Sequence, residues 1–363
     1  MKIGILTFHC AHNYGAVLQC YALQETLKNM GHKVEVIDYR PDFLLSPYRV
    51  WDIYRDKSYN SFLKRLVLEC LKLPRRIAKR KVFDLFIQTK LCLTKEKMIS
   101  PSFDAYIMGS DQIWNPQITN GIHKPYFGYF NFPKGNRKYI AYAASMEVSS
   151  LNQETKDFFT KALKNFDAIS VREKTLANLL QPLTPQKIET VLDPTLLANP
   201  TMWDSIIKRP LINNKYVLVY QVRYDPNTKR IAQSIANQIG AKVIEITALI
   251  YQEYKRNVYQ CCSPEEFLGW IKYADCIVTT SFHGTAFSII FRKPFYCLKL
   301  GKGDTRAVSL LQELGLENRM VEKTSSPDFQ LIDYQKATME LTHLQKKSHQ
   351  YLVSALSNIP YIE

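Results

Sequence analysis

The chain has 363 residues, of which 46% are hydrophobic and 22% charged, and its 48 Lys and Arg against 33 Asp and Glu give a net charge of +15. This length exceeds one ordinary core and favours two domains, and the composition excludes an intrinsically disordered chain. The surplus of positive charge indicates an anionic partner, such as a phosphorylated metabolite, a lipid surface or a nucleic acid.

Targeting and cysteine patterns exclude further classes. The start "MKIGILTFHC" lacks the apolar core of a secretory signal, and no run of about 18 apolar residues could span a bilayer. The eight cysteines form no C-x-x-C pair, which argues against a zinc finger or an iron–sulfur cluster. We therefore expect a cytoplasmic protein with reduced thiols.

The N-terminal part is typical of a strand–helix–strand unit. Within residues 2–39, two apolar β-prone runs flank a helical pattern that ends near Gly31. Residues 43–100 break the alternation and predict a helical insertion. Between Arg55 and Lys81 this insertion has ten basic residues against two acidic ones. Such a helix would either rest on an anionic membrane surface, at the inner face of the cytoplasmic membrane, or present a solvated basic face.

Strands alternating with helices resume after the insertion, which predicts parallel sheets. We expect two Rossmann-like, doubly wound α/β domains that face each other across a cleft. The first comprises residues 1–198 and the second 199–333, and a helix within 334–363 returns to complete the first. Other helices are expected at 226–239 and near 264, where Ser263 and Glu266 form a capping box.

Four polar segments each follow a predicted strand directly. Since ligands of doubly wound sheets bind outside the carboxyl ends of the strands, we expect all four at the rim of the cleft. They are "HCAHNYG" (9–15), "GSDQIWNP" (109–116), "VREKT" (171–175) and "SFHGT" (281–285).

In the last of these segments, His283 would stand at a strand end. Gly284 would allow a tight turn, and Thr285 would cap a helix whose free N–H groups attract an anion. A histidine beside a bound anion is suited to proton transfer near neutral pH. The alternative is a histidine that only bonds a loop carbonyl.

Two arginines are candidates for anion binding. Arg172 could hold a carboxylate or phosphate, or it could pair with Glu173 or Asp167. Arg306 could reach the cleft from "GKGDTR", or it could belong to a surface turn. No G-x-G-x-x-G or P-loop pattern is present, which disfavours a dinucleotide cofactor or a P-loop nucleotide site.

Two segments are candidates for an acceptor wall. The first follows the small residue Ser110 and combines groups that bind sugar hydroxyls with a ring that stacks on a sugar, in Asp111, Gln112, Trp114 and Asn115. The alternative is a turn around a buried tryptophan.

In "HCAHNYG", Asn13 would bind a ligand or cap the next helix, Gly15 would close the turn, and Tyr14 would lie beside them. His12, with His9, is a secondary proton-transfer candidate. The spacing of these histidines and Cys10 disfavours a metal site.

Five segments, in order, resemble the polysaccharide pyruvyltransferase family over roughly residues 1 to 320. They are "HNYGAVLQCYALQ", "IMGSDQIWNP", "SVREKT", "VLDPTLL" and "TTSFHGTAFSIIFRKPF". The resemblance implies a glycosyltransferase-B-like pair of domains. It also implies an enzyme that transfers pyruvate from phosphoenolpyruvate, its co-substrate, to a sugar and forms a ketal. The sugar would belong to a surface polysaccharide or to its polyprenyl-diphosphate-linked precursor. The resemblance implies no required cofactor.

The resemblance also implies residue roles. His283 would act in acid–base chemistry, and Arg172 would hold the anionic donor. From the chemistry of the reaction itself, Asp111 is a secondary candidate for activating the acceptor. Some relatives have arginine where this chain has Ser281, so Arg306, Arg223 or Lys293 would have to supply the missing cation.

Three other functions remain open at this point. The first is a nucleotide-sugar glycosyltransferase of the same shape, and the second is a sugar-binding scaffold without activity. The third is a nucleic-acid binder, which is disfavoured because the charge is concentrated in one segment and no nucleic-acid module is present.

Overall fold

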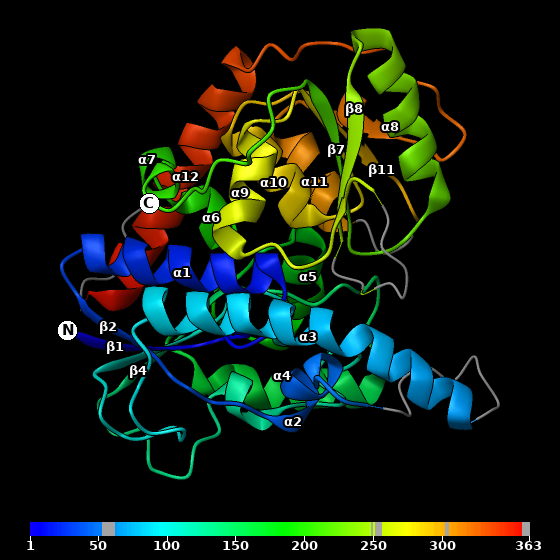
Figure 1. Cartoon of the computed structure of the whole chain (residues 1–363). Coiled ribbons are helices and arrows are strands. Elements are labelled where there is room, and N and C mark those ends of the chain that lie inside the picture. Colours follow the sequence, from blue (N-terminus) through cyan, green and yellow to red (C-terminus); the bar gives the residue numbers. More distant parts are fainter. Residues whose placement is uncertain (53–61, 248–249, 251–255, 302–304, 358–363) are drawn as a thin grey trace.

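The computed structural model describes residues 1–52, 62–247, 250, 256–301 and 305–357, and its strands form two six-stranded sheets in which every pairing is parallel (Figure 1). The first sheet contains β1 (Lys2–Leu6), β2 (Lys33–Val36), β3 (Ala105–Met108), β4 (Lys138–Ala144), β5 (Ala168–Val171) and β6 (Ile188–Thr190). The second contains β7 (Tyr216–Gln221), β8 (Lys242–Thr247), β9 (Val258–Tyr259), β10 (Cys276–Thr279), β11 (Phe295–Leu298) and β12 (Met320–Val321).

The strand order of each sheet reverses once. The first sheet has the order β2-β1-β3-β4-β5-β6 and the second β12-β11-β10-β7-β8-β9. The reversal therefore lies between β1 and β3 in one sheet and between β7 and β10 in the other. In doubly wound sheets ligands bind beside such reversals. Two of the predicted rim segments, 9–15 and 109–116, meet at the reversal of the first sheet, and 281–285 lies at the reversal of the second. The predicted α/β class and paired doubly wound sheets are confirmed.

The helices include α1 (Tyr14–Asn29), α4 (Gln153–Ala162) and α5 (Lys174–Leu180) around the first sheet, and α8 (Pro226–Ile239), α9 (Pro264–Lys272), α10 (Phe282–Ile290) and α11 (Thr305–Glu313) around the second. Short helices α6 (Pro194–Leu197) and α7 (Pro200–Asp204) occupy the passage between the sheets. The capping box is confirmed, since Glu266 N donates to Ser263 Oγ and Ser263 N donates to the Glu266 carboxylate.

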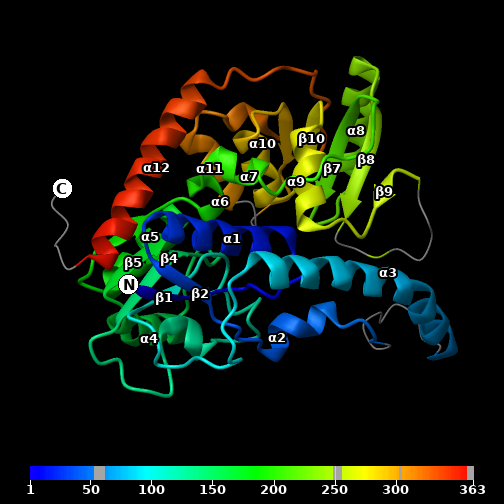
Figure 2. The ribbon, with the colours of Figure 1, turned by 60° about the vertical axis from the view of Figure 1, so that its left-hand side comes forward.

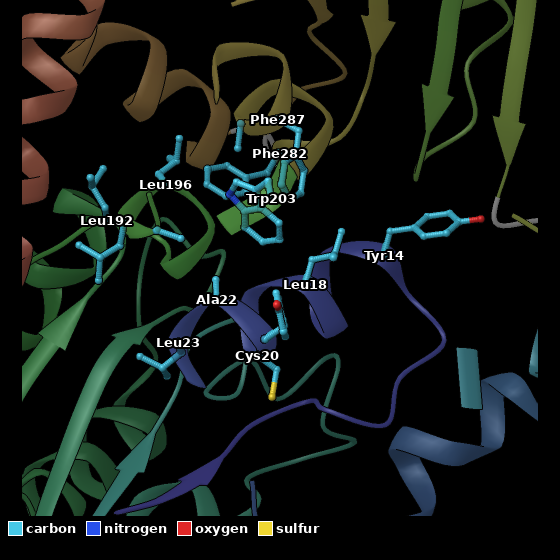
Figure 3. Close-up of a cluster of buried hydrophobic side chains, with 14 of the residues drawn as sticks. Tyr14, Leu18, Cys20, Ala22, Leu23, Leu192, Leu196, Trp203, Phe282 and Phe287 are labelled. Atoms are coloured by element: carbon cyan, nitrogen blue, oxygen red, sulfur yellow. The ribbon is translucent and has the colours of Figure 1, made fainter. Parts of the chain in front are cut away.

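Helix α1 is the centre of the core between the two sheets. It is buried on nearly every side, because one hydrophobic cluster joins it to both halves of the chain. Leu18 and Ala22 share this cluster with Leu196 of α6 and Phe287 of α10 (Figure 3). A helix buried on all sides needs small or apolar residues around its whole circumference, which "YGAVLQCYALQ" supplies.

The last helix, α12 (Gln335–Leu356), spans both halves along one flank of the molecule (Figure 2). Near its start, Tyr334 Oη donates to the Lys293 carbonyl, 2.6 Å away, beyond the end of α10. Near its end, Tyr351 Oη donates to the Ala141 carbonyl of β4 over 2.8 Å. The chain after β12 therefore returns to the first sheet and packs against it.

The insertion contains α2 (Asp42–Leu45), a short 3-10 turn η1 (Ser46–Tyr48) and the long helix α3 (Phe62–Lys90). The expected helical character is present, although Arg55 and Lys57 of the basic segment lie outside the described residues. The basic face expected for this segment is only partly exposed in the N-terminal part of α3. Lys72, Arg76 and Lys79 are buried, whereas several of its hydrophobic residues are exposed. No helix among the described residues is long and apolar enough to cross a membrane.

Candidate active site

A cavity of about 390 Å³ lies between the carboxyl ends of the two sheets, at both strand-order reversals. Its volume is in the range of small-molecule sites. Segments after β1, β3, β7 and β10 supply its walls, and α2, η1 and α11 close it. The lining residues are Phe8, Ala11, Asn13, Ala16, Phe43, Leu44, Pro47, Tyr48, Asp111, Gln112, Ile118, Glu147, Val222, Arg223, Thr280, Ser281, Phe282, His283, Cys297, Arg306 and Ala307.

His283 lies in the first turn of α10, where the two halves of the chain meet. Ser281 is the N-cap of this helix, and its hydroxyl accepts from Gly284 N at 3.3 Å. The imidazole packs against Gly15 in the first turn of α1, where a Cβ would lie 2.0 Å from Nδ1 of His283. Only glycine leaves space for the ring here. Two helix N-termini, each with positive partial charge, therefore flank the cavity.

Asp193 approaches the other side of His283. It follows β6, caps α6 by accepting from Thr195 N, and its Oδ2 is 3.7 Å from Nε2 of His283. Burial alone would raise the pKa of Asp193, but contacts with His283, Arg172 and Thr195 outweigh burial and hold it well below its usual value. An ionised carboxylate therefore lies beside the imidazole at the edge of the cavity.

Arg172 is buried among three carboxylates. Its guanidinium is 2.5 Å from Asp193, 3.4 Å from Glu173 and 3.8 Å from Asp111. Burial would lower the pKa of Arg172, but these carboxylates outweigh burial and raise it. The pKa of Glu173 is raised because its burial outweighs the attraction of Arg172. The alternative pairing with Glu173 is thus present together with two further ion pairs.

Arg306 of α11 supplies a second guanidinium. It lines the cavity, and it lies 3.6 Å from the carboxylate of Glu147. Both arginines lie near the Phe282 ring, whose centroid is 4.7 Å from the Arg172 guanidinium carbon and 5.8 Å from that of Arg306. Burial first, and the charge of Arg172 second, lower the pKa of Arg306. An anion placed between the arginines would relieve this repulsion.

Several buried polar atoms around this cavity have no hydrogen-bond partner among the described residues. Three are nitrogens that can donate, namely Nη2 of Arg172, Nε of Arg306 and Nε2 of His283, and two are carboxylate oxygens of Glu147 and Glu173. Unsatisfied buried donors are rare in folded proteins and expensive to leave unpaired. Their convergence beside one cavity indicates a site for an anionic ligand with further polar groups.

Comparison with known proteins identifies the family. The sequence profile described as polysaccharide pyruvyl transferase matches residues 13–300, which is most of the chain. This chain belongs to the polysaccharide pyruvyl transferase family. The resemblance seen in the five motifs is therefore confirmed, and the protein is a member of a transferase family that acts on polysaccharide. No curated protein sequence matches the chain.

Solved structures similar to this family member match it over most of its length at low sequence identity. A UDP-N-acetylglucosamine 2-epimerase from Rickettsia bellii is 10% identical with a TM-score of 0.45, over 98% of this chain and 96% of that one. The Arabidopsis thaliana protein UGT89C1, complexed with UDP, is 11% identical with a TM-score of 0.39, over 99% of this chain and 96% of that one.

The structure brings seven of the predicted site residues to the cavity wall. They are Asn13, Asp111, Gln112, Arg223, Ser281, His283 and Arg306. Asn13 and Ser281 also cap α1 and α10, so the two possible roles of Asn13 are compatible. Asp111 has a φ of 76°, a conformation that aspartate adopts more readily than most residues. Of the three cations considered for the position of Ser281, Lys293 lies beyond the other end of α10 and does not line the cavity.

Other predicted residues support the site from behind. Arg172 and Ser110 do not line the cavity; Ser110 Oγ donates to the Ala143 carbonyl and contacts Asp193 Oδ2 at 3.4 Å. Asn115 donates to Oε1 of Gln112 over 2.5 Å and so orients that side chain.

The end of the second sheet also differs from the expectation. Helix α10 begins at Phe282, so Thr285 is within the helix and donates to the Ser281 carbonyl; it does not cap. Gly284 is needed where α10 crosses β10, because a Cβ would lie 2.3 Å from Thr279 Oγ1.

Two predicted cleft residues, Tyr14 and Trp114, are structural instead. Tyr14 is buried, stacks on Phe267 with 4.4 Å between ring centroids, and donates to the Cys262 carbonyl at 3.0 Å. Trp114 is also buried and donates from Nε1 to the Tyr126 carbonyl at 3.0 Å, so the alternative of a turn around a buried tryptophan is correct.

His12 Nε2 is 3.1 Å from Asp84 of α3. The pKa of His12 is lowered, because its burial outweighs the attraction of the Asp84 carboxylate. His9 is likewise buried, 2.9 Å from Asp38. Neither histidine reaches the cavity wall. Among the described residues, no group of three His, Cys, Asp or Glu side chains could hold a metal ion.

Sequence reasoning missed Asp193, Glu147 and Glu173 as site residues. Asp193 and Glu147 follow β6 and β4, so the rule that singled out the other rim segments would have found both. It also missed the contribution of the insertion, whose residues Phe43 and Tyr48 form one wall. No motif marked these two residues, because only the folded chain brings α2 and η1 over the carboxyl ends of β1 and β3.

Proposed function

We propose that this protein transfers pyruvate from phosphoenolpyruvate to a sugar of a polysaccharide or of its lipid-linked precursor and forms a pyruvate ketal. The observation that carries the proposal is that one buried nitrogen each of Arg172, Arg306 and His283 has no hydrogen-bond partner among the described residues, and that all three lie beside one cavity. In phosphoenolpyruvate the carboxylate is bonded to a carbon atom, and the phosphate is bonded to the oxygen on that same carbon. Guanidinium groups bind both anions well. Membership of the family supports the same reaction.

The charges around the cavity constrain how such a donor is held. Four carboxylates (Asp111, Glu147, Glu173 and Asp193) surround two arginines, so the arginines alone leave no excess positive charge. Burial raises the pKa of Glu173 above its usual value, and the Asp193 carboxylate lies 3.7 Å from Nε2 of His283. Arg223 at the cavity wall and the N-termini of α1 and α10 supply further positive potential.

In the proposed reaction, protonated His283 gives its proton to the methylene carbon of phosphoenolpyruvate. The neighbouring carbon becomes electron-poor and is attacked by a sugar hydroxyl, which loses its proton to a base. The carbon–oxygen bond to phosphate breaks, and phosphate leaves with the bonding electrons. The leaving phosphate takes up the proton that the base had accepted. A second hydroxyl of the sugar then attacks the same carbon, loses its proton to His283, which the first step left neutral, and closes the ketal. Asp111, the carboxylate at the cavity wall after β3, is placed to accept a hydroxyl proton.

The decisive experiment offers the protein phosphoenolpyruvate with a panel of free and polyprenyl-diphosphate-linked sugars, and measures released phosphate and the acceptor mass. We expect phosphate release together with a mass gain equal to pyruvate less one water. A parallel incubation with sugar nucleotides tests the glycosyltransferase alternative. Nucleotide release there, with no phosphate released from phosphoenolpyruvate, would overturn the proposal.

The role of His283 is tested by His283→Ala, which we expect to lower turnover by about 10²-fold or more, as for loss of a general acid. The matched control is His343→Ala, on the exposed surface of α12. Full turnover by His283→Ala would refute the assignment. Arg306→Gln is expected to weaken protection of the protein by phosphoenolpyruvate against thermal unfolding, a readout that needs no acceptor.

A further inference from the structure

The N-terminal part of α3 exposes a continuous apolar surface. Leu63 is 72% exposed, Val67 52%, Leu71 56% and Ile77 51%. At 3.6 residues per turn these four side chains fall within about one third of the helix circumference. We call these four residues the α3 stripe. In both views the first turns of α3 extend beyond the helices that cover the sheets (Figures 1 and 2).

Polar contacts on the opposite face keep the stripe turned outward. Arg76 forms a buried ion pair with Glu69 and donates to the Val50 carbonyl at 3.3 Å. Asp52 N donates to the same glutamate at 3.2 Å. Rotation of the helix to bury the stripe would expose these bonds and place charges against the protein. Apolar side chains held outward in this way indicate a surface that binds another phase or molecule.

The charges beside the stripe decide between two occupants. Lys64, Arg80 and Lys81 are exposed along its margins, and α3 as a whole contains nine basic residues against two acidic ones. A second copy of this chain, paired stripe to stripe, would bring two strongly basic helices together and repel. An anionic bilayer instead offers apolar acyl chains to the stripe and negative headgroups to the lysines and arginines.

We propose that α3 docks this protein on an anionic membrane surface, with the stripe inserted at the headgroup–acyl boundary and the basic side chains extended to the phosphates. The apolar residues, and not the basic charge alone, determine attachment. The docked helix adjoins the cavity, because Val50, to which Arg76 is bonded, follows the cavity residue Tyr48 by two positions. If the proposed function holds, docking brings the cavity close to lipid-linked acceptors; the docking itself does not depend on that function.

Flotation with lipid vesicles tests the proposal directly. We expect the protein to float with phosphatidylcholine vesicles that contain phosphatidylglycerol, and not with pure phosphatidylcholine. Replacing all four stripe residues (Leu63→Ser, Val67→Ser, Leu71→Ser, Ile77→Ser) is expected to lower the partition coefficient at least about tenfold. The matched control replaces exposed hydrophobic residues elsewhere, Leu211→Ser, Leu331→Ser and Met339→Ser, and should float as the wild type does.

A second measurement uses the wild-type stripe and so does not depend on the folding of the variant. Cys70 and Cys92 are exposed cysteines, and only Cys70 lies beside the stripe. An environment-sensitive fluorophore on Cys70, in a Cys92→Ser protein, should shift to shorter wavelength with anionic vesicles. The same label on Cys92, in a Cys70→Ser protein, should not shift.

Three results would overturn the proposal. The first is no binding of the wild-type protein to anionic vesicles. The second is unchanged binding after stripe replacement, which would reduce the contact to electrostatic adsorption. The third is a dimer in solution that the stripe variant converts to monomer, since the stripe would then be an interface between copies. None of these outcomes changes the phosphate-release assay, so failure of docking and failure of the pyruvyl transfer are distinguishable.

Discussion

Gly15→Ala is the sharpest test of how the two halves of the chain form the site. A Cβ at Gly15 would lie 2.0 Å from Nδ1 of His283 and 2.5 Å from both Cγ and Cε1, so the three nearest atoms all belong to one ring. Ordinary contact requires about 3.5 Å or more, so the ring or the start of α1 must move by more than about 1 Å. Overpacking of this kind costs about 1–3 kcal/mol of unfolding free energy.

The assay is a double-mutant cycle in urea with the wild type, Gly15→Ala, His283→Ala and the double variant. We expect Gly15→Ala to destabilise the wild type, but to be neutral or stabilising once the imidazole is gone, because alanine favours a helix by up to about 1 kcal/mol over glycine. In the wild-type background, displacement of the ring should also lower pyruvyl transfer by about 10²-fold. Equal destabilisation in both backgrounds would show that the imidazole does not pack on Gly15 and refute the reasoning.

Three further substitutions test the surrounding contacts by chemical denaturation. Asp193→Asn removes the partner of Arg172 and His283 and should cost about 3–5 kcal/mol at pH 7. The pKa of Asp193 is depressed in the folded state, so its contribution to stability is fully present above its unfolded pKa of about 4. That contribution falls progressively as the pH drops from there toward the depressed folded pKa. The two proteins should therefore converge in acid, and a constant difference would contradict this. Tyr14→Phe keeps the stacking on Phe267 but removes the bond to the Cys262 carbonyl, and should cost about 1 kcal/mol; no loss would mean that this bond contributes nothing. Burial lowers the pKa of Lys79 to about 8, so the folded state disfavours its charge. The wild type should therefore gain stability as pH rises from about 8 to about 10. Lys79→Met should be more stable than the wild type at pH 7 and should lose that advantage over the same pH range. A difference between the two proteins that does not depend on pH would refute the depressed pKa.

Much of the fold could be read from the sequence, because local patterns decide it. The run "KYVLVYQV" can only be a buried strand, and the capping box at Ser263 starts α9 where expected. The rim rule placed Asp111 and His283 beside one cavity although they are distant in the chain and follow strands of different sheets, since each sheet presents the carboxyl ends of its parallel strands at one edge and the two edges face the same cavity.

The sequence alone could not assign each rim residue to the cavity or to the core. Tyr14 and Gly15 are neighbours in one motif, yet Tyr14 anchors α1 to α9 and Gly15 receives the His283 ring. Successive residues of a helix point about 100° apart, so adjacent positions in a motif have different surroundings. A motif therefore marks a location in the fold, and not the direction of each side chain.

The sequence by itself determined the two parallel sheets, the rim segments and the family of this protein. The tertiary structure decided that Asp193 faces His283, that α2 and η1 close the cavity, and that Leu63, Val67, Leu71 and Ile77 of α3 are exposed while Lys72, Arg76 and Lys79 are buried. The physical reason is the range of the interactions. Periodicity and caps act within a few residues, whereas ion pairs between Arg172 and Asp193 or between Arg306 and Glu147 join segments that only the packed sheets bring together.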